Sequence, residues 1–455
     1  MEMVLEFLRD VLSQPALLIG IMSCVGLVAL KRPFHKVMTG TLKPILGYLM
    51  LAAGAGVIVS NLDPLGKMIE HGFHITGVVP NNEAIVAVAQ KVLGVETMSI
   101  LVVGLLMNLC IARFTKFKYV FLTGHHSLFM ACLMSAVLGT AGLSGMELIL
   151  VGGFLMGAWS AISPAIGQSY TSKVTDGDEI AIGHFGSLGY YLSAWVAKYV
   201  GKADDSTEDI EIPEKWGFLR DSTLSTALTM IVFYLIAAIA AGSEFVSTLS
   251  GDMSPYLYAV MSAMNFAVGV TIVYSGVRMI LGDLIPAFQG IATKIIPNAI
   301  PAVDCAVFFT YAPTAVVLGF LSSFIGGIIG MLILGAVGGV LIIPGLVPHF
   351  FCGATAGIYG NATGGRRGAA VGAFLNGLAI TFLPAMALPV LGQLGFQNTT
   401  FGDADFAVMG LVLGNAYEWV GMAGIYGIVA IAALVLIIPN FIKTKGKVIN
   451  YVEEE

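Results

Sequence analysis

The chain has 455 residues, of which 57% are hydrophobic and only 11% are charged, and its formal net charge is −6. A water-soluble domain cannot bury so large an apolar fraction, so the composition predicts an integral membrane protein and excludes a nucleic-acid-binding protein or a secreted disulfide scaffold. Its apolar runs are continuous rather than alternating, which favours spanning helices over a β-barrel. The 56 glycines and 17 prolines indicate broken or closely packed helices, as is typical of transporters.

The first part of the chain contains five candidate spans. Glu2, Glu6, Arg9 and Asp10 precede the first apolar run without the basic segment or cleavage site of a signal peptide, so we expect this run to be a retained helix. A spanning helix needs about 20 apolar residues. The apolar runs that approach or reach this length are residues 15–30, 44–60, 98–112, 118–143 and 146–162.

A polar stretch at residues 167–223 separates these runs from those that follow, and its acidic part at 203–214 is too charged for lipid, which predicts a solvent-facing loop. The later apolar runs are 224–241, 257–281, 302–347, 368–391 and 406–438. The run at 302–347 is long enough for two spans, with a turn expected near Gly326–Gly327 or Gly338–Gly339. The sequence therefore predicts an all-α membrane protein with about eleven transmembrane helices.

Basic residues gather in four regions: Lys31 to Lys43, Arg113 to Lys118, the polar stretch, and Lys443 to Lys447. The positive-inside rule places these regions in the cytoplasm, which predicts an outside N-terminus and an inside C-terminus. Two halves of five spans would then be inverted repeats. The predicted division is 1–166 for the first repeat, 167–223 for a cytoplasmic loop, 224–395 for the second repeat, and 396–455 for the last span and tail. A short match of residues 45–57 to 280–291 supports the repeat weakly.

Ionisable residues at membrane depth are candidates for function, because each costs about 2.5 to 3.5 kcal/mol to insert. Asp304 stands in an apolar segment with no basic neighbour in sequence, so it either contacts a substrate or ion or caps a helix end. His125 and His126 follow a Thr-Gly break that could face a cavity, although an isolated histidine is more often a packing residue. His184 is equally well interpreted as a site residue or as a loop residue.

The segment around Gly353 and Thr355 is rich in small residues and could form a re-entrant tip that exposes backbone groups and a hydroxyl, or could be a site of close helix packing. Arg366 and Arg367 follow two glycines and are interpreted first as a cytoplasmic anchor, and second as a phosphate or partner contact. The five cysteines have no metal-ligand spacing and are predicted to be packing residues.

Several chemical motifs are missing from the sequence. It has no GxxxxGK[ST] loop, no HExxH and no GxSxG, so we expect no catalytic residue, no metal and no cofactor in the chain itself. A pore or carrier for a polar solute remains. One such carrier is an ion-coupled secondary transporter in which Asp304 or Glu83 carries a proton, whereas a membrane scaffold without transport would have no reason to bury these groups.

The sequence resembles the ascorbate-type enzyme IIC of the bacterial phosphoenolpyruvate-dependent phosphotransferase system (PTS), over essentially the whole chain. The matching segments are Leu122-Thr-Gly-His, Val174-Thr-Asp-Gly with Ile182-Gly-His, Ser222-Thr-Leu-Ser-Thr-Ala, Gly276-Val-Arg-Met, Ala302-Val-Asp-Cys-Ala with Tyr311-Ala-Pro, and Ile342-Ile-Pro-Gly with Ala354-Thr. The resemblance implies eleven spans in two inverted repeats plus one helix, re-entrant hairpins, a homodimer in the bacterial inner membrane, and elevator transport by a core domain against a scaffold. It also implies separate IIA and IIB partners, since no phosphorylatable domain is evident in the sequence.

The same resemblance implies where the substrate binds, namely at the backbone of a glycine-rich turn and at four side-chain or tip positions. These positions are Gly54, Ala55 and Gly56 in the turn, and His125, His184, Asp304, and the tip at Gly353 and Thr355.

Four positions depart from the family pattern. Close ascorbate-type members have glutamines four and five residues after the first histidine and one after the second, and a tyrosine in the first polar segment. Phe129, Met130, Phe185 and Glu83 stand there in this chain. Since amide donors are lost and a carboxylate is gained, we predict a permease for L-ascorbate or a related sugar acid or polyol, with a hydrogen-bonding pattern at Glu83 and Phe185 different from that of the ascorbate permeases.

Overall fold

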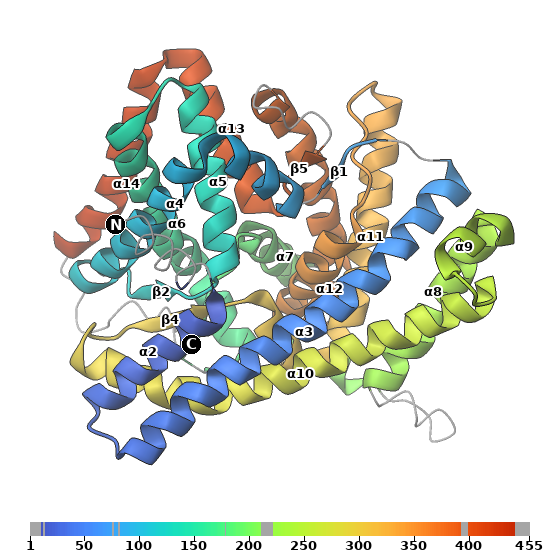
Figure 1. Ribbon diagram of the computed structural model, residues 1–455, viewed down its shortest axis with the longest axis horizontal. Helices are drawn as coiled ribbons and strands as arrows, with labels where there is room; N and C mark the ends of the chain where they lie inside the picture. The colour runs from blue at the N-terminus through green and yellow to red at the C-terminus, as the bar shows by residue number, and fades with distance from the viewer. Residues whose placement is uncertain are drawn as a thin grey trace.

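The computed structural model describes residues 11, 14–74, 77–80, 82–177, 179–210, 222–392 and 399–441. The described chain is almost entirely helical, with five very short strands between the helices (Figure 1). The elements of the first half are α2 (Pro15–Ala29), α3 (Phe34–Phe73), β1 (Val79–Pro80), α4 (Asn82–Phe114), β2 (Tyr119–Phe121), α5 (Gly124–Thr140), α6 (Gly145–Val174), β3 (Ala181–Ile182), α7 (Ser187–Val200) and the 3₁₀ turn η1 (Thr207–Asp209).

The second half contains the same kinds of element. They are α8 (Ser222–Ala241), α9 (Ser243–Ser250), α10 (Pro255–Lys294), β4 (Ile300–Val303), the 3₁₀ helix η3 (Cys305–Thr310), α11 (Pro313–Ala336), α12 (Leu346–Gly392), β5 (Thr399–Thr400), α13 (Ala404–Val420) and α14 (Met422–Phe441). Within the described residues, seven helices are long and apolar enough to cross a membrane, or eight if the bent pair α8 and α9 forms one broken span. The chain is therefore a multi-pass membrane protein, while the number eleven stays a prediction.

The longest helix, α12, is sharply bent near its middle. Gly364 and Gly365 leave the helical region there, and Gly365 has a φ of +59°, which a residue with a side chain rarely adopts. Gly360 and Gly368 approach each other across the bend, where a Cβ on either would lie 2.4 Å from the other's carbonyl oxygen. One continuous element of 47 residues is thus two helices joined at a glycine corner.

The helices α3 and α10, of 40 residues each, pack along one another in opposite directions at one side of the molecule (Figure 1). A Cβ on Gly54 of α3 would lie 2.8 Å from the backbone nitrogen of Val273, and a Cβ on Gly276 of α10 would lie 2.6 Å from that of Leu51. Because glycines occupy the crossing, the two backbones touch directly, as in close-packed membrane helices.

Each of these contacts from a residue of α3 to α10 is matched by the same contact from the equivalent residue of α10 to α3. The two helices are therefore related by an approximate two-fold axis. The equivalent pairs are Gly47 with Gly269, Leu51 with Val273, Gly54 with Gly276 and Ile58 with Ile280. This relation supports inverted repeats but corrects the predicted match of residues 45–57 to 280–291, whose register was wrong. A short match among glycine-rich helices cannot define a register, whereas interlocking contacts can.

Two further expectations about the organisation were wrong. The run at 302–347 holds one long helix, α11, and not two spans, because its first residues form β4 and η3. The second of the two expected turns is present, since the chain leaves the helix at Gly338, whose φ is +72°. The predicted polar loop holds the end of α6, strand β3 and helix α7. Helix α7 escaped prediction because it has only 14 residues, yet it packs on α12 with small and aromatic side chains buried at helical spacing.

The acidic segment after α7 is not free in solvent over its described part. Asp205 pairs with Arg366 beside the bend of α12, and Glu208 accepts hydrogen bonds from the first backbone amides of α11, at Thr314 and Ala315. The Glu208 carboxylate therefore satisfies amides that a helix N-terminus leaves unpaired. Arg366, interpreted from the sequence as an anchor, has a partner within the chain.

Candidate functional site

Three short parallel strands bring distant parts of the chain to one point. Strand β4 lies between β2 and β3, with Phe121 opposite Ala302 and Ile182 opposite Val303. The carboxyl ends of parallel strands meet at the same edge, so the residues that follow them are neighbours. Among these residues are three that the sequence indicated: His125 after β2, His184 after β3, and Asp304 directly after β4.

A second parallel pair, β1 with β5, adds residues that sequence analysis did not indicate. Asn82 follows β1 and Asp403 follows β5. The Asn82 side chain donates from Nδ2 to Oδ2 of Asp403 at 2.6 Å, and its Oδ1 accepts from the backbone N–H of Gly402 at 2.9 Å. The amide is thereby fixed with its NH₂ group toward the carboxylate.

Both groups of residues face one cavity of about 580 Å³. One wall is a stripe of α3 that runs from Tyr48 past Ala55 to Glu70, and the opposite wall is formed by the loops after the strands and by the start of α12. The polar residues of this second wall are Asn82, His125, His126, His184, Asp304, Cys305 and Asp403. A cavity of this size suits a small solute with several polar groups.

Asp304 caps the start of η3 and also lines the cavity, so the cap interpretation is confirmed and contact with a substrate or ion stays a prediction. Its Oδ1 accepts from the backbone N–H of Ala306 at 3.4 Å, at the start of η3. Its Oδ2 lies 3.4 Å from Nε2 of His125, whose Nδ1 is 3.3 Å from the Tyr48 hydroxyl on α3. The His125 side chain is 38% exposed to the cavity, whereas that of Asp304 is 9% exposed. A ligand can therefore reach both.

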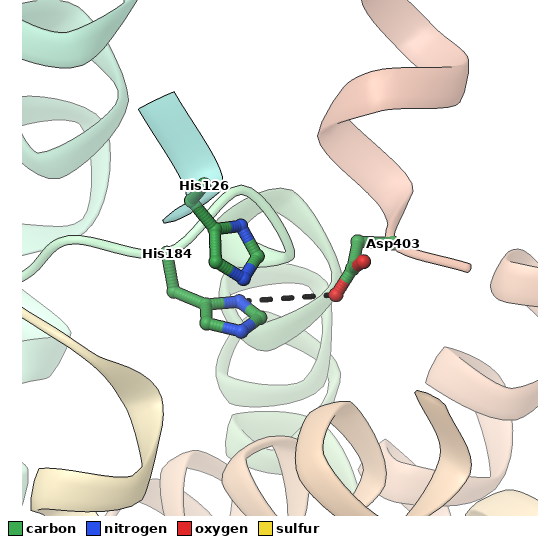
Figure 2. Close-up of side chains that lie close together, drawn as sticks. All are labelled: His126, His184 and Asp403. Carbon is green, nitrogen blue, oxygen red and sulfur yellow. Dashed lines mark ion pairs between the residues drawn. The ribbon is translucent and has the colours of Figure 1, made fainter. Parts of the chain in front are cut away.

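A second group of polar side chains is more deeply buried. The rings of His126 and His184 lie there with their centres 3.8 Å apart and their planes tilted by 45°, close to Asp403 (Figure 2). Nδ1 of His184 is 3.9 Å from Oδ1 of Asp403 and 2.8 Å from the Tyr190 hydroxyl. Cys352 donates its thiol to the same Oδ1 at 2.8 Å. All five side chains are buried.

The comparisons with known proteins agree with this geometry. A model of the EIIC-GAT family, described as "PTS system sugar-specific permease component", matches residues 10–405. The chain belongs to this family. The permease is also similar to the "Ascorbate-specific PTS system EIIC component" of Mycoplasma pneumoniae (strain ATCC 29342 / M129 / Subtype 1), with 26% identity over 474 aligned positions that cover 90% of this chain and 70% of the relative. The resemblance noted in the sequence is thus confirmed, and with it a multi-pass PTS permease.

Of the remaining residues predicted to bind the substrate, most do not line the cavity. Gly54 and Gly56 do not lie in a turn, because α3 is a continuous helix there and its backbone groups are bonded within it. Ala55 of the same segment does line the cavity. Gly353 packs with its backbone against Ser323 of α11, and Thr355 is fully buried and donates to the carbonyl of Phe351. Neither is among the residues lining the cavity.

The four positions that depart from the family pattern also differ from one another. Phe129 lines the cavity, and Met130 is fully buried beneath it. The ring of Phe185 is buried and stacks on Phe121 with ring centres 4.6 Å apart, and it is not among the residues lining the cavity. Its backbone N–H donates to Nδ1 of His126 at 3.3 Å, and its ring centre is 6.1 Å from that of His126. Glu83 belongs to α4, but its side chain lies outside the described part of the structure.

Asp403 had the clearest signature among the missed residues. It directly precedes the apolar run at 406–438 as part of Asp403-Ala-Asp405, and an acidic residue before a helix is normally interpreted as a cap. Asp405 does have such a structural role, because it accepts from the Leu188 backbone N–H, the Ser187 hydroxyl and the Trp159 indole. Only the tertiary fold separates the two aspartates.

Among the residues that the structure describes, two sets of side chains have a composition that could hold a metal ion, with donor atoms within 4.8 Å of one another: His126, His184 and Asp403, and His184, Asp304 and Cys305. The hydrogen bonds around the rings oppose this role. Metal-bound histidines usually donate their second ring nitrogen to an acceptor. Here Nδ1 of His126 and Nδ1 of His184 both accept backbone N–H groups, from Phe185 and Gly186.

Proposed function

We propose that this permease binds L-ascorbate or a related small polyhydroxylated molecule in the cavity, carries it across the membrane, and presents it to a phosphorylated IIB subunit. The convergence of His125, His184 and Asp304 on one cavity, after three parallel strands, is the observation that carries this proposal. These residues are far apart in sequence and share no role in packing one helix.

The chemistry of the cavity suits a polyhydroxylated ligand. A carboxylate such as Asp304 accepts hydrogen bonds from neighbouring hydroxyls, and an imidazole N–H donates to a ring, enolate or hydroxyl oxygen. The Tyr48 hydroxyl on the opposite wall can do either. A ligand held between the two walls would thus connect α3 with the loops after the strands.

We also propose that the protein works as a homodimeric elevator of two inverted repeats with its N-terminus outside. The glycine-packed pair α3 and α10 would be part of the static scaffold, and the helices that carry the buried polar groups would be part of the moving core. Support comes from the cavity, which lies along this boundary and has the α3 stripe as one wall. The large apolar side chains exposed on α8, such as Val232 and Ile239, would contact lipid or the second copy.

Uptake into membrane vesicles tests the coupling. If the proposal is right, labelled substrate accumulates in phosphorylated form only when IIA, IIB and a phosphoryl donor are inside, and an uncoupler leaves this uptake unchanged. If the chain is instead an ion-coupled carrier, unmodified substrate accumulates without IIB and is lost on addition of the uncoupler. Native mass spectrometry in mild detergent tests the dimer, because a single monomer mass would contradict it.

A further inference from the structure

The charged groups of the cavity do not balance. Among its described lining residues are four carboxylates, Asp63, Glu70, Asp304 and Asp403, and one cation, Lys67. The ammonium group of Lys67 is 2.8 Å from Asp63, and the Lys67 side chain is 53% exposed at the mouth of the cavity. This cation is paired there and does not compensate the two deeper carboxylates, of which Asp304 has Nε2 of His125 at 3.4 Å.

The partners of Asp403 are uncharged. Its two oxygens accept from the Asn82 amide and from the Cys352 thiol, so both behave as acceptors, which is the pattern of an ionised carboxylate. The side chain is 6% exposed. The ring nitrogen of His184 is 3.9 Å away and is the one basic group within ion-pair distance among the described residues.

That imidazole is neutral in this structure, as is its neighbour. Nδ1 of His184 accepts the Gly186 N–H at 3.2 Å, and Nδ1 of His126 accepts the Phe185 N–H at 3.3 Å. A nitrogen that accepts an N–H carries no proton, so each ring has its single proton on Nε2. The ring centres are only 3.8 Å apart, a distance at which two positive charges would repel. His126 and His184 therefore supply hydrogen-bond donors without positive charge.

From this excess of carboxylates over cations we infer that the cavity is selective for an uncharged polyol or sugar over an anion such as ascorbate. Hydroxyl groups of the ligand donate to Asp304 and Asp403, and ligand oxygens accept from the Nε2–H groups. Asp304 has the His125 imidazole 3.4 Å away. An anionic ligand beside Asp403, by contrast, would meet a carboxylate whose hydrogen-bond partners, Asn82 and Cys352, are uncharged. The inference rests on the proposed function and narrows its substrate class.

The test is calorimetric binding to the purified full chain at pH 7 with a chelator present, using pentitols and hexitols as uncharged probes and L-ascorbate as the anion. We expect at least one uncharged probe to bind tenfold or more tightly than ascorbate. Asp403→Asn, which is nearly isosteric, should reduce that ratio at least tenfold by strengthening ascorbate binding and weakening polyol binding. Asp176→Asn is the matched control, because Asp176 lies exposed in a turn outside the cavity and should leave the ratio within twofold.

Ascorbate binding more tightly than every polyol, with no gain in Asp403→Asn, would overturn the inference while leaving a PTS permease intact. Ascorbate binding that Zn²⁺ strengthens and the chelator weakens would also overturn it, since a cation would then compensate Asp403. If Asp403→Asn fails to fold, Asp304→Asn should reduce the ratio in the same direction. Failure of the proposed function would differ from all of these: no probe would bind, and IIB-dependent uptake would be absent.

Discussion

Two regions of the molecule are stabilised in different ways: the helix pair α3 and α10 by close backbone packing, and the surroundings of the cavity by hydrogen bonds and charge. Along the pair, glycines allow backbone to touch backbone, and the contacts repeat under an approximate two-fold axis. Around the cavity, short parallel strands are followed by His125, His184 and Asp304, whose polar groups need specific partners. The first arrangement tolerates almost no added volume, whereas the second tolerates little change of charge or hydrogen-bonding type.

The largest expected effect comes from adding volume to the pair. In Gly54→Leu, the new Cβ would lie 2.7 Å from the carbonyl oxygen of Gly269, and backbone atoms cannot move aside as a flexible side chain can. We expect the melting temperature to fall, with a stability loss at the upper end of the ~1–3 kcal/mol typical of overpacking. Gly56→Leu is the control on the same helix, because a Cβ there meets nothing within 4 Å. Equal melting temperatures for both variants would show that α3 and α10 do not touch through glycines.

A change of charge in the cavity should act on binding instead. Asp304→Asn keeps the shape but offers donors on one side where the carboxylate only accepts, so we expect binding of the substrate to weaken by roughly 2 kcal/mol or more, the scale of hydrogen bonds to charged groups. Because the Asn side chain can still cap η3 through its oxygen, the melting temperature should change little. Substrate affinity and melting temperature should be measured on one preparation of the variant. A lowered melting temperature with unchanged affinity would show that Asp304 is only a structural cap.

A smaller effect separates two phenylalanines that looked equivalent in the sequence. Phe129 lines the cavity, so Phe129→Gln should restore an amide to it and strengthen L-ascorbate binding by ~1 kcal/mol, about fivefold. Phe185→Gln should destabilise the protein instead, because that ring is fully buried against Phe121. Binding isotherms and melting curves of the two variants check this contrast, and similar behaviour of both would contradict it.

The smallest effect is expected at the surface pair Arg366 and Asp205. Both side chains are 44% exposed, and the backbone N–H of Arg366 also donates to the carbonyl of Asp205 at 2.7 Å. Arg366→Ala removes only the screened ion pair, so it should cost ~0.2–1 kcal/mol by thermal unfolding and leave ligand affinity unchanged. A large loss of binding would mean that the segment after α7 controls the cavity.

Prediction from the sequence succeeded for features that depend only on residues close together in the chain. A long apolar helix such as α6 follows from composition alone, and Asp304 was identified because a carboxylate in an apolar run has to be compensated. It failed where the requirement was tertiary. Helix α7 is too short to be recognised as a span, and the corner at Gly364 and Gly365 is not distinguishable in sequence from other glycine pairs.

By itself, the sequence determined that the chain crosses a membrane several times, that it resembles the PTS permeases, and that His125, His184 and Asp304 are expensive to bury. Only the tertiary structure decided that these residues meet, because three strands of two to four residues carry no periodic pattern yet align their carboxyl ends. It also decided that Asp403 faces the cavity beside neutral imidazoles. The reason is that charge compensation and tautomer depend on which groups lie within a few ångströms, and no sequence spacing specifies that distance.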